Sequence, residues 1–182
     1  MTLTESAAIK IGSSAPNFNL PATDDKNYTL SDFKDSKGFV VVFTCNHCPY
    51  AIASWPIIVK LANEFKEKGI SFIAINSNDA REYPEDSFEE MKKKVNVWHI
   101  NFPYLRDETQ ETAKGFRAVC TPDIFVYDND RKLYYHGRIN DNWQEPSMVV
   151  TADLKDALNS LLINSPPPQN QKPSMGCSIK WK

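Results

Sequence analysis

The sequence predicts an α/β fold in which a central mixed β-sheet is flanked by helices, with an N-terminal β extension and an extended C-terminal tail. Two short, continuously apolar runs have the composition of strands buried on both faces of a sheet, and helical patterns follow them after short polar connections. This alternation of periods is typical of βα units around one sheet. A chain of 182 residues, 41% of them hydrophobic, is long enough for one domain with its own core.

The first half of the chain contains two weak strands, two strong strands and one long helix. The strand candidates are Asn17 to Leu20, Tyr28 to Leu30, Phe39 to Phe43 and Ile70 to Ile75. Apolar residues recur at helical spacing from Ile52, and this helix is expected to end at Gly69. Pro56 lies inside the helical pattern, so we expect a kink or a restart there.

The second half adds shorter elements and the tail. The expected helices are Glu85 to Val97, Thr109 to Phe116 and one that starts near Thr151. The expected strands are Phe102 to Leu105, Ile124 to Tyr127 and Leu133 to His136, and the last two form a hairpin. Three consecutive prolines, 166–168, forbid a helix after the last one. We therefore divide the chain into a domain at 1–163 and an extended, proline-rich tail at 164–182.

The charge and hydropathy of the sequence argue against nucleic acid and membranes as binding partners. The net charge of −2 leaves no basic stripe for a nucleic-acid backbone. No run approaches the roughly 20 apolar residues of a membrane span, and the N-terminal residues lack the pattern of a signal segment. We expect a protein that binds neither nucleic acid nor membrane and is located in the cytoplasm.

Cys45 and Cys48 form a Cys-X-X-Cys pair directly after the apolar run that ends at Phe43 and directly before a helix. At a helix start, free N–H groups and the helix dipole stabilise a thiolate, which is the nucleophile of disulfide exchange. The competing interpretation is a structural zinc site, which needs two further ligands, and the sequence has no second Cys-X-X-Cys or His-X-X-X-His to supply them. The pair therefore favours redox chemistry, with no metal.

Several motifs together resemble a known family. A strand, a Cys-X-X-Cys pair, a helix and then Thr121-Pro122 before a hairpin resemble the order of elements in thioredoxin-fold proteins. The segment 15–20, APNFNL, resembles the opening of the alkyl hydroperoxide reductase and thiol-specific antioxidant (AhpC/TSA) family. Segments 45–50, 120–123 and 176–181 resemble a peroxiredoxin-like subgroup with CNHCPY, CTPD and GCSIKW motifs. The resemblance implies a thioredoxin-like fold.

The resemblance also implies roles for individual residues. Cys45 would be the more exposed, attacking sulfur and Cys48 the resolving thiol. His47 resembles a histidine whose cationic ring stabilises the thiolate, which predicts a potential more oxidising than that of thioredoxin. An idle surface histidine is the alternative. Pro122 would form a cis peptide bond that faces the two cysteines and exposes the backbone of Thr121 to a substrate strand.

Two further cysteines are possible accessory thiols. Cys120 is expected to be a small buried apolar residue beside the proline loop, and a redox role for it is the minority interpretation. Cys177, in the stiff tail, is expected to dock on the domain. It would either pair with Cys120 or reach the Cys45 site as a third thiol, whereas an unpaired tail cysteine is the alternative.

The predicted function is a thiol-disulfide oxidoreductase with an antioxidant role and no cofactor. Its substrate would be a protein disulfide or a peroxide, and its electrons would come from the thioredoxin or glutathione system. One alternative is a thiol peroxidase in which Cys45 attacks peroxide, but Val41 to Thr44 lack the Pro-x-x-x-Thr/Ser-x-x pattern that precedes a peroxidatic cysteine. Another is a copper(I)-binding or regulatory module, for which His47 would be a poorly placed ligand because it lies inside the dithiol turn.

Overall fold

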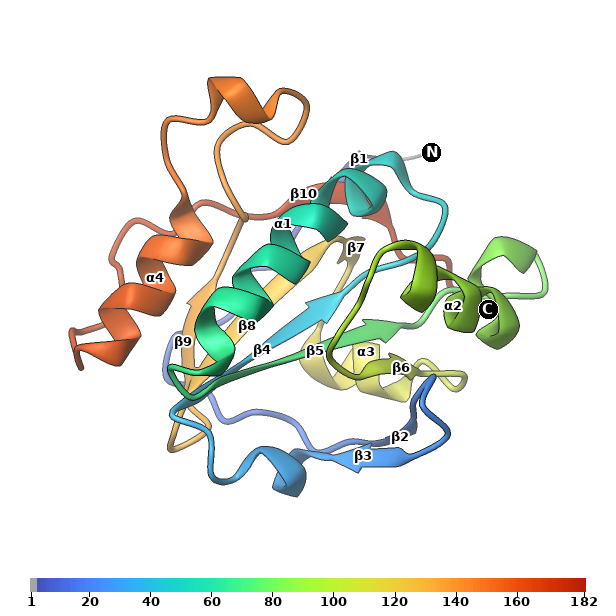
Figure 1. The fold of residues 1–182 in the computed structure, drawn as a ribbon, viewed down its shortest axis with the longest axis horizontal. Helices are drawn as coiled ribbons and strands as arrows, with labels where there is room; N and C mark the ends of the chain where they lie inside the picture. The colour runs from blue at the N-terminus through green and yellow to red at the C-terminus, as the bar shows by residue number, and fades with distance from the viewer. Residues whose placement is uncertain (1–2) are drawn as a thin grey trace.

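A computed structural model describes residues 3–182, and its centre is a five-stranded mixed sheet (Figure 1). In the order of the sheet, the strands are β6 (Tyr104–Arg106), β5 (Ile70–Asn76), β4 (Gly38–Phe43), β8 (Asp123–Asp128) and β9 (Leu133–His136). β4 runs parallel to β5 and antiparallel to β8. The mixed central sheet predicted from the sequence is confirmed.

The central strand β4 is buried along its whole length because layers cover both faces of the sheet. Its alternate side chains enter two different cores, as the period of two in a strand requires. Val40 and Val42 pack against helices α1 (Pro49–Lys66) and α4 (Asp153–Leu162), which lie over the same face of the sheet (Figure 1). On the other face, Phe43 packs against Phe116, the last residue of α3 (Glu111–Phe116).

Helix α1 starts immediately after Cys48, its N-cap, and continues through Pro56. The predicted restart at Pro56 is wrong. A proline leaves the carbonyl four residues earlier without its helical hydrogen bond, and here that carbonyl belongs to Ile52, which is exposed, as is Pro56. Water can therefore satisfy the carbonyl, and the helix tolerates the proline.

The remaining predicted elements are present with shifted boundaries. The weak strands are β2 (Asn19–Pro21) and β3 (Asn27–Thr29), which pair as a hairpin. The charged helix α2 (Phe88–Val97) begins later than expected, because Pro84–Asp86 forms a separate 3-10 turn and Ser87 caps the helix by accepting a hydrogen bond from the Glu90 N–H. Within residues 3–182, no helix has the length and apolarity that crossing a membrane would require.

The tail is extended, as predicted, but one part of it is a paired strand. β10 (Met175–Ser178) lies between β1 (Leu3–Glu5) and β7 (Cys120–Thr121) and runs antiparallel to both. This small second sheet lies at the end of the domain where α1 begins (Figure 1). The chain thus returns, at its end, to the Cys-X-X-Cys loop.

Candidate active site

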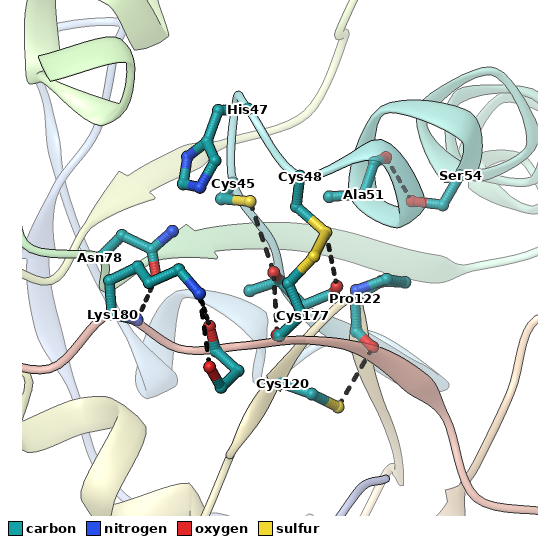
Figure 2. The surroundings of a disulfide bond; sticks show 12 residues. Cys45, His47, Cys48, Ala51, Ser54, Asn78, Cys120, Pro122, Cys177 and Lys180 are labelled. Carbon is teal, nitrogen blue, oxygen red and sulfur yellow. Dashed lines mark hydrogen bonds between the residues drawn. A yellow bond between two sulfur atoms is a disulfide. The ribbon is translucent and has the colours of Figure 1, made fainter. Parts of the chain in front are cut away.

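The Cys-X-X-Cys loop links the end of β4 to the start of α1, and its second cysteine is bonded to the tail. Cys48 forms a disulfide with Cys177, with 6.3 Å between their Cα atoms and a sequence separation of 129 (Figure 2). Cys45 is a free thiol. Of the two dockings expected for Cys177, the structure has the one in which the tail reaches the cysteine pair, and its bond is to Cys48.

Cys45 lies in the same small apolar cluster as the disulfide. This cluster contains Cys45, Cys48, Ala51 and Cys177. Both Cys45 and Cys48 are 0% exposed. The expectation that Cys45 is the more exposed sulfur is therefore wrong, because residues of β7 and β10, far away in the sequence, close over the loop.

The surroundings of Cys45 favour a neutral thiol. Burial raises the pKa of Cys45 from an ordinary value of 9.0 to about 11, and the negative charge of Asp86 adds to the effect. The Thr121 hydroxyl, 3.3 Å from the Cys45 Sγ atom, and the N–H groups of Cys48 and His47 lower this pKa but do not compensate. The position of the cysteine pair at a helix start predicts a stabilised thiolate, and the structure shows the opposite balance at Cys45.

Asp86 holds the Cys-X-X-Cys loop in place through hydrogen bonds. Its Oδ1 atom accepts a hydrogen bond from the Asn46 N–H at 2.6 Å, and its Oδ2 atom accepts one from His47 Nδ1 at 2.7 Å. Asn76 and Asn78 each donate a further side-chain N–H to this carboxylate. Burial alone would raise the pKa of Asp86, but the hydrogen bonds from His47, Asn46 and Asn78 outweigh it and the pKa is lowered. The loop thus rests on a buried, ionised carboxylate.

His47 has two partners in this arrangement. Besides its hydrogen bond to Asp86, its ring stacks on Tyr83 with the centroids 5.1 Å apart. Its side chain is only 16% exposed. The part of the alternative that placed His47 at the surface is therefore wrong, whereas the absence of a catalytic duty and the proposed effect of His47 on the redox potential both stay untested predictions.

Pro122 follows a cis peptide bond, as expected, and it faces the disulfide (Figure 2). The backbone of Thr121, however, is not open to a substrate, because Thr121 is paired with Cys177 of β10. Cys120 is buried, as expected, and its sulfur points away from the disulfide (Figure 2). Burial, and then the charge of Asp123, raises the pKa of Cys120 far above its ordinary value.

Comparison with known proteins places these features in a family. The pattern of the AhpC/TSA family matches residues 11–136, which is most of the chain. The chain belongs to the AhpC/TSA family. Among curated relatives of this AhpC/TSA protein, the thiol-disulfide oxidoreductase ResA of Bacillus thuringiensis is 28% identical over 130 residues, which cover 71% of this chain and 70% of ResA. ResA of Bacillus cereus is 28% identical over 125 residues, 69% of this chain and 68% of ResA.

Solved structures agree with the fold. A conserved protein from Geobacillus kaustophilus superposes with a TM-score of 0.95 at 46% identity, covering 100% of this chain and 97% of the other. A protein from Sinorhizobium meliloti superposes with a TM-score of 0.94 at 38% sequence identity, covering 98% of both chains. The thioredoxin domain of a thiol-disulfide oxidoreductase from Bacteroides vulgatus superposes with a TM-score of 0.61 at 23% sequence identity, covering 71% of this chain and 89% of the other. This likeness supports the fold alone. The thioredoxin-like fold is confirmed.

Three groups of this AhpC/TSA protein lie close enough to hold a metal ion together. The ligand atoms of Cys45, His47 and Asp86 all lie within 4.8 Å of one another. This cluster has Asp86 in place of Cys48, so the expectation that His47 is poorly placed beside the two thiolates stays a prediction. Both carboxylate oxygens of Asp86 already accept two hydrogen bonds each, so a metal ion bound there would have to displace donors.

Sequence reasoning missed Asp86, which we had placed inside a charged, solvated helix. A usable signal was present. β4 and β5 are parallel neighbours, so the segments after them meet at one edge of the sheet, and a polar run, Asn76 to Asp79, begins at the last residue of β5. That run, together with the proline two residues before Asp86, indicates that polar side chains lie beside the cysteine loop and can form hydrogen bonds with it.

Proposed function

We propose that this AhpC/TSA protein is a thiol-disulfide oxidoreductase whose redox centre contains three sulfurs, those of Cys45, Cys48 and Cys177. The observation that carries this function is the disulfide between Cys48 and Cys177, next to the free thiol of Cys45. A disulfide and a free thiol in one apolar cluster are the two reactants of disulfide exchange. The ResA relatives, which are named thiol-disulfide oxidoreductases, support the proposal.

The local structure suits Cys48 for reversible bonding. Cys48 is the N-cap of α1, an 18-residue helix, and the positive end of a helix stabilises a thiolate there. A thiol reductant that supplies two electrons would open the disulfide of Cys48 and Cys177, and the reduced chain would pass these electrons to the disulfide of a protein substrate. We propose the thioredoxin or glutathione system as the reductant, and an antioxidant role in the cytoplasm.

The peroxidase alternative receives less support from the site. Peroxide is attacked by a thiolate, and Cys45 is buried and largely protonated at neutral pH. We therefore propose that any consumption of peroxide is slow compared with disulfide exchange.

The test is the reduction of insulin disulfides by dithiothreitol, with and without the purified full chain. We expect the wild-type chain to accelerate the reduction and the double variant Cys45→Ser/Cys48→Ser to have no effect. Cys120→Ser is the matched control and is expected to keep the wild-type rate, because the Cys120 sulfur points away from the centre. A double variant as active as the wild type would disprove the proposal.

Two parallel measurements separate the alternatives. Rapid consumption of hydrogen peroxide, with sluggish reduction of insulin, would identify a peroxidase instead. Tight binding of one copper(I) ion, with no disulfide exchange at all, would identify a metal-binding module.

A further inference from the structure

The strand β10 is held at the cysteine site in two independent ways. By main-chain pairing, Cys177 lies opposite Thr121 and Ser178 opposite Cys120, directly before the cis peptide bond of Pro122. By covalent bonding, Cys177 is joined to Cys48. Addition of an extended segment to a strand edge is a general way in which proteins bind peptides. β10 therefore has the position of a bound peptide whose cysteine has reacted.

We propose that β10 is a built-in substrate. β7 and Cys48 form a binding site for an extended segment in which an apolar residue, a glycine and a cysteine follow one another. In the oxidised chain, Met175, Gly176 and Cys177 fill this site. The inference rests on the proposed function and names the class of partner that the same centre accepts. A partner protein that presents such a segment would displace the tail.

The glycine is required by close approach to the backbone. A Cβ atom built on Gly176 would lie 2.1 Å from the carbonyl oxygen of Thr121 and 2.6 Å from its carbonyl carbon. Both atoms are main-chain atoms, and Thr121 is fixed between its pairing with β10 and the cis bond to Pro122. A partner segment in the same register therefore needs glycine directly before its cysteine.

The preference for an apolar residue comes from a neighbouring cavity. Met175, two residues before the cysteine, lies at the wall of a cavity of about 380 Å³, which Tyr50, Pro122 and Trp143 also line. The rings of Tyr50 and Trp143 are in contact, with centroids 3.9 Å apart. Charged residues also line the cavity (Glu5, Arg138, Asp141 and Lys172), but most of its exposed wall is apolar, and a partner residue at the position of Met175 would lie at this wall.

Release of the tail follows from exchange within the centre. The thiolate of Cys45 attacks the sulfur of Cys48, so that a bond between Cys45 and Cys48 forms as the bond between Cys48 and Cys177 breaks. Cys177 leaves as a thiolate and takes up the proton that Cys45 has lost, so no outside oxidant or reductant is needed. A thiol reductant then opens the bond between Cys45 and Cys48 with two electrons, and the Cys48 thiolate attacks the cysteine sulfur of a partner disulfide, whose other sulfur leaves as a thiolate. Cys45 next attacks Cys48 in this mixed disulfide, so that the partner cysteine leaves as a thiol and the bond between Cys45 and Cys48 forms again. In this scheme Cys48 forms the mixed disulfide and Cys45 resolves it, the reverse of the roles expected from the resemblance.

The test uses the full chain with Cys45→Ser/Cys177→Ser, in which Cys48 is the remaining thiol of the centre. The probes are two synthetic peptides, Met-Gly-Cys-Ser-Ile-Lys and its Met-Ala-Cys counterpart, each activated as a mixed disulfide with nitrothiobenzoate. We expect the glycine peptide to react at least about tenfold faster, a ratio that corresponds to about 1.4 kcal/mol. Mass spectrometry is expected to find the peptide on Cys48. Equal rates for the two peptides would overturn the inference.

A second variant tests whether the tail blocks the site. In Gly176→Val the added side chain would meet the Thr121 carbonyl and detach β10, so the reduced variant is expected to react with the glycine peptide about tenfold faster than the reduced wild type. Gly115→Ala is the control, because its Cβ would make only an ordinary contact, 3.6 Å from Pro16. A wild-type rate in a folded Gly176→Val chain would also overturn the inference.

These outcomes are distinct from failure of the proposed function. If the chain reacts neither with insulin nor with the small reagent dithionitrobenzoate, the oxidoreductase itself is disproved. If it reacts with both but does not distinguish the two peptides, only the built-in substrate is disproved.

Discussion

Replacement of Asp86 by asparagine is expected to lower the free energy of unfolding by about 3 kcal/mol, because each hydrogen bond to a charged group contributes about 1.5–3 kcal/mol. Asp86 is fully buried and acts only as an acceptor, for N–H groups of Asn46, His47, Asn76 and Asn78. An asparagine side chain would present an NH2 group to at least one of these donors. That donor would remain buried without an acceptor, at further cost.

The same variant is expected to change the chemistry of Cys45. The charge of Asp86 is, after burial, the second cause of the raised pKa of Cys45, so its removal should bring the titration midpoint of Cys45 below about 11. Carbon-13 NMR of the Cys45 Cβ atom follows this titration directly. A variant that only loosened the fold would have no reason to move the midpoint in the expected direction before it unfolded.

A matched control separates burial from charge. Asp25→Asn also removes one carboxylate, but Asp25 is exposed and its only ion pair, among residues 3–182, is with Lys92 at the surface. We expect a change in stability below about 1 kcal/mol, as for surface ion pairs in general. If urea unfolding gave Asp86→Asn the same stability as Asp25→Asn, the supporting role of Asp86 would be refuted.

Acid should reduce the difference in stability between Asp86→Asn and the wild type. The pKa of Asp86 is lower in the folded chain than in the unfolded chain, so its stabilising effect is present above the unfolded pKa of about 3.9. This effect is lost as the pH falls through the folded pKa. The stabilities of the two chains should therefore converge in acid.

The parts of the site that follow from local sequence were predictable. The apolar run of β4, the two cysteines after it and the start of α1 all lie between residues 38 and 49, and hydrophobic period and helix signals act at that range. The cis bond before Pro122 has no local signal, because cis bonds are a minority even before proline. It was predicted from the resemblance alone.

The parts that join distant segments were not predictable. β1 has three residues and β10 has four, too few for a recognisable hydrophobic period. They are strands only because β1 pairs with β10 and β10 also pairs with β7. The partner of Cys177 depends on this pairing, since the register that sets Cys177 opposite Thr121 also brings it to Cys48. Sequence could offer alternatives for Cys177 but not choose among them.

Raising the pH from about 8.5 to about 11 is expected to destabilise the wild-type chain by about 2 kcal/mol more than the Cys45→Ser variant. The pKa of Cys45 is raised by burial, and then by Asp86, from 9.0 to about 11 in the folded chain. The folded chain therefore holds a proton that the unfolded chain releases. This stabilising effect is complete below the unfolded pKa and is lost as the pH rises through the folded pKa.

Comparison with the Cys45→Ser variant isolates the titration of Cys45 from that of the other groups that lose a proton in alkali. Tyr127 and Tyr135 are buried and their pKa values are also raised, but they are present in both chains and their effects cancel in the difference. Urea unfolding at a series of pH values measures the difference directly. Parallel stability curves for the two chains would show that Cys45 titrates normally.

The raised pKa of Cys45 also explains how the Cys48 and Cys177 disulfide can persist beside a free thiol. Only the thiolate attacks a disulfide, so a thiol that is almost entirely protonated at neutral pH exchanges slowly. The rate of internal exchange should rise about tenfold for each pH unit until the pH approaches the pKa of Cys45. Disulfide mapping after acid quenching, at increasing pH, should show the bond moving from Cys177 to Cys45, and a rate that does not depend on pH would exclude Cys45 as the attacking thiol.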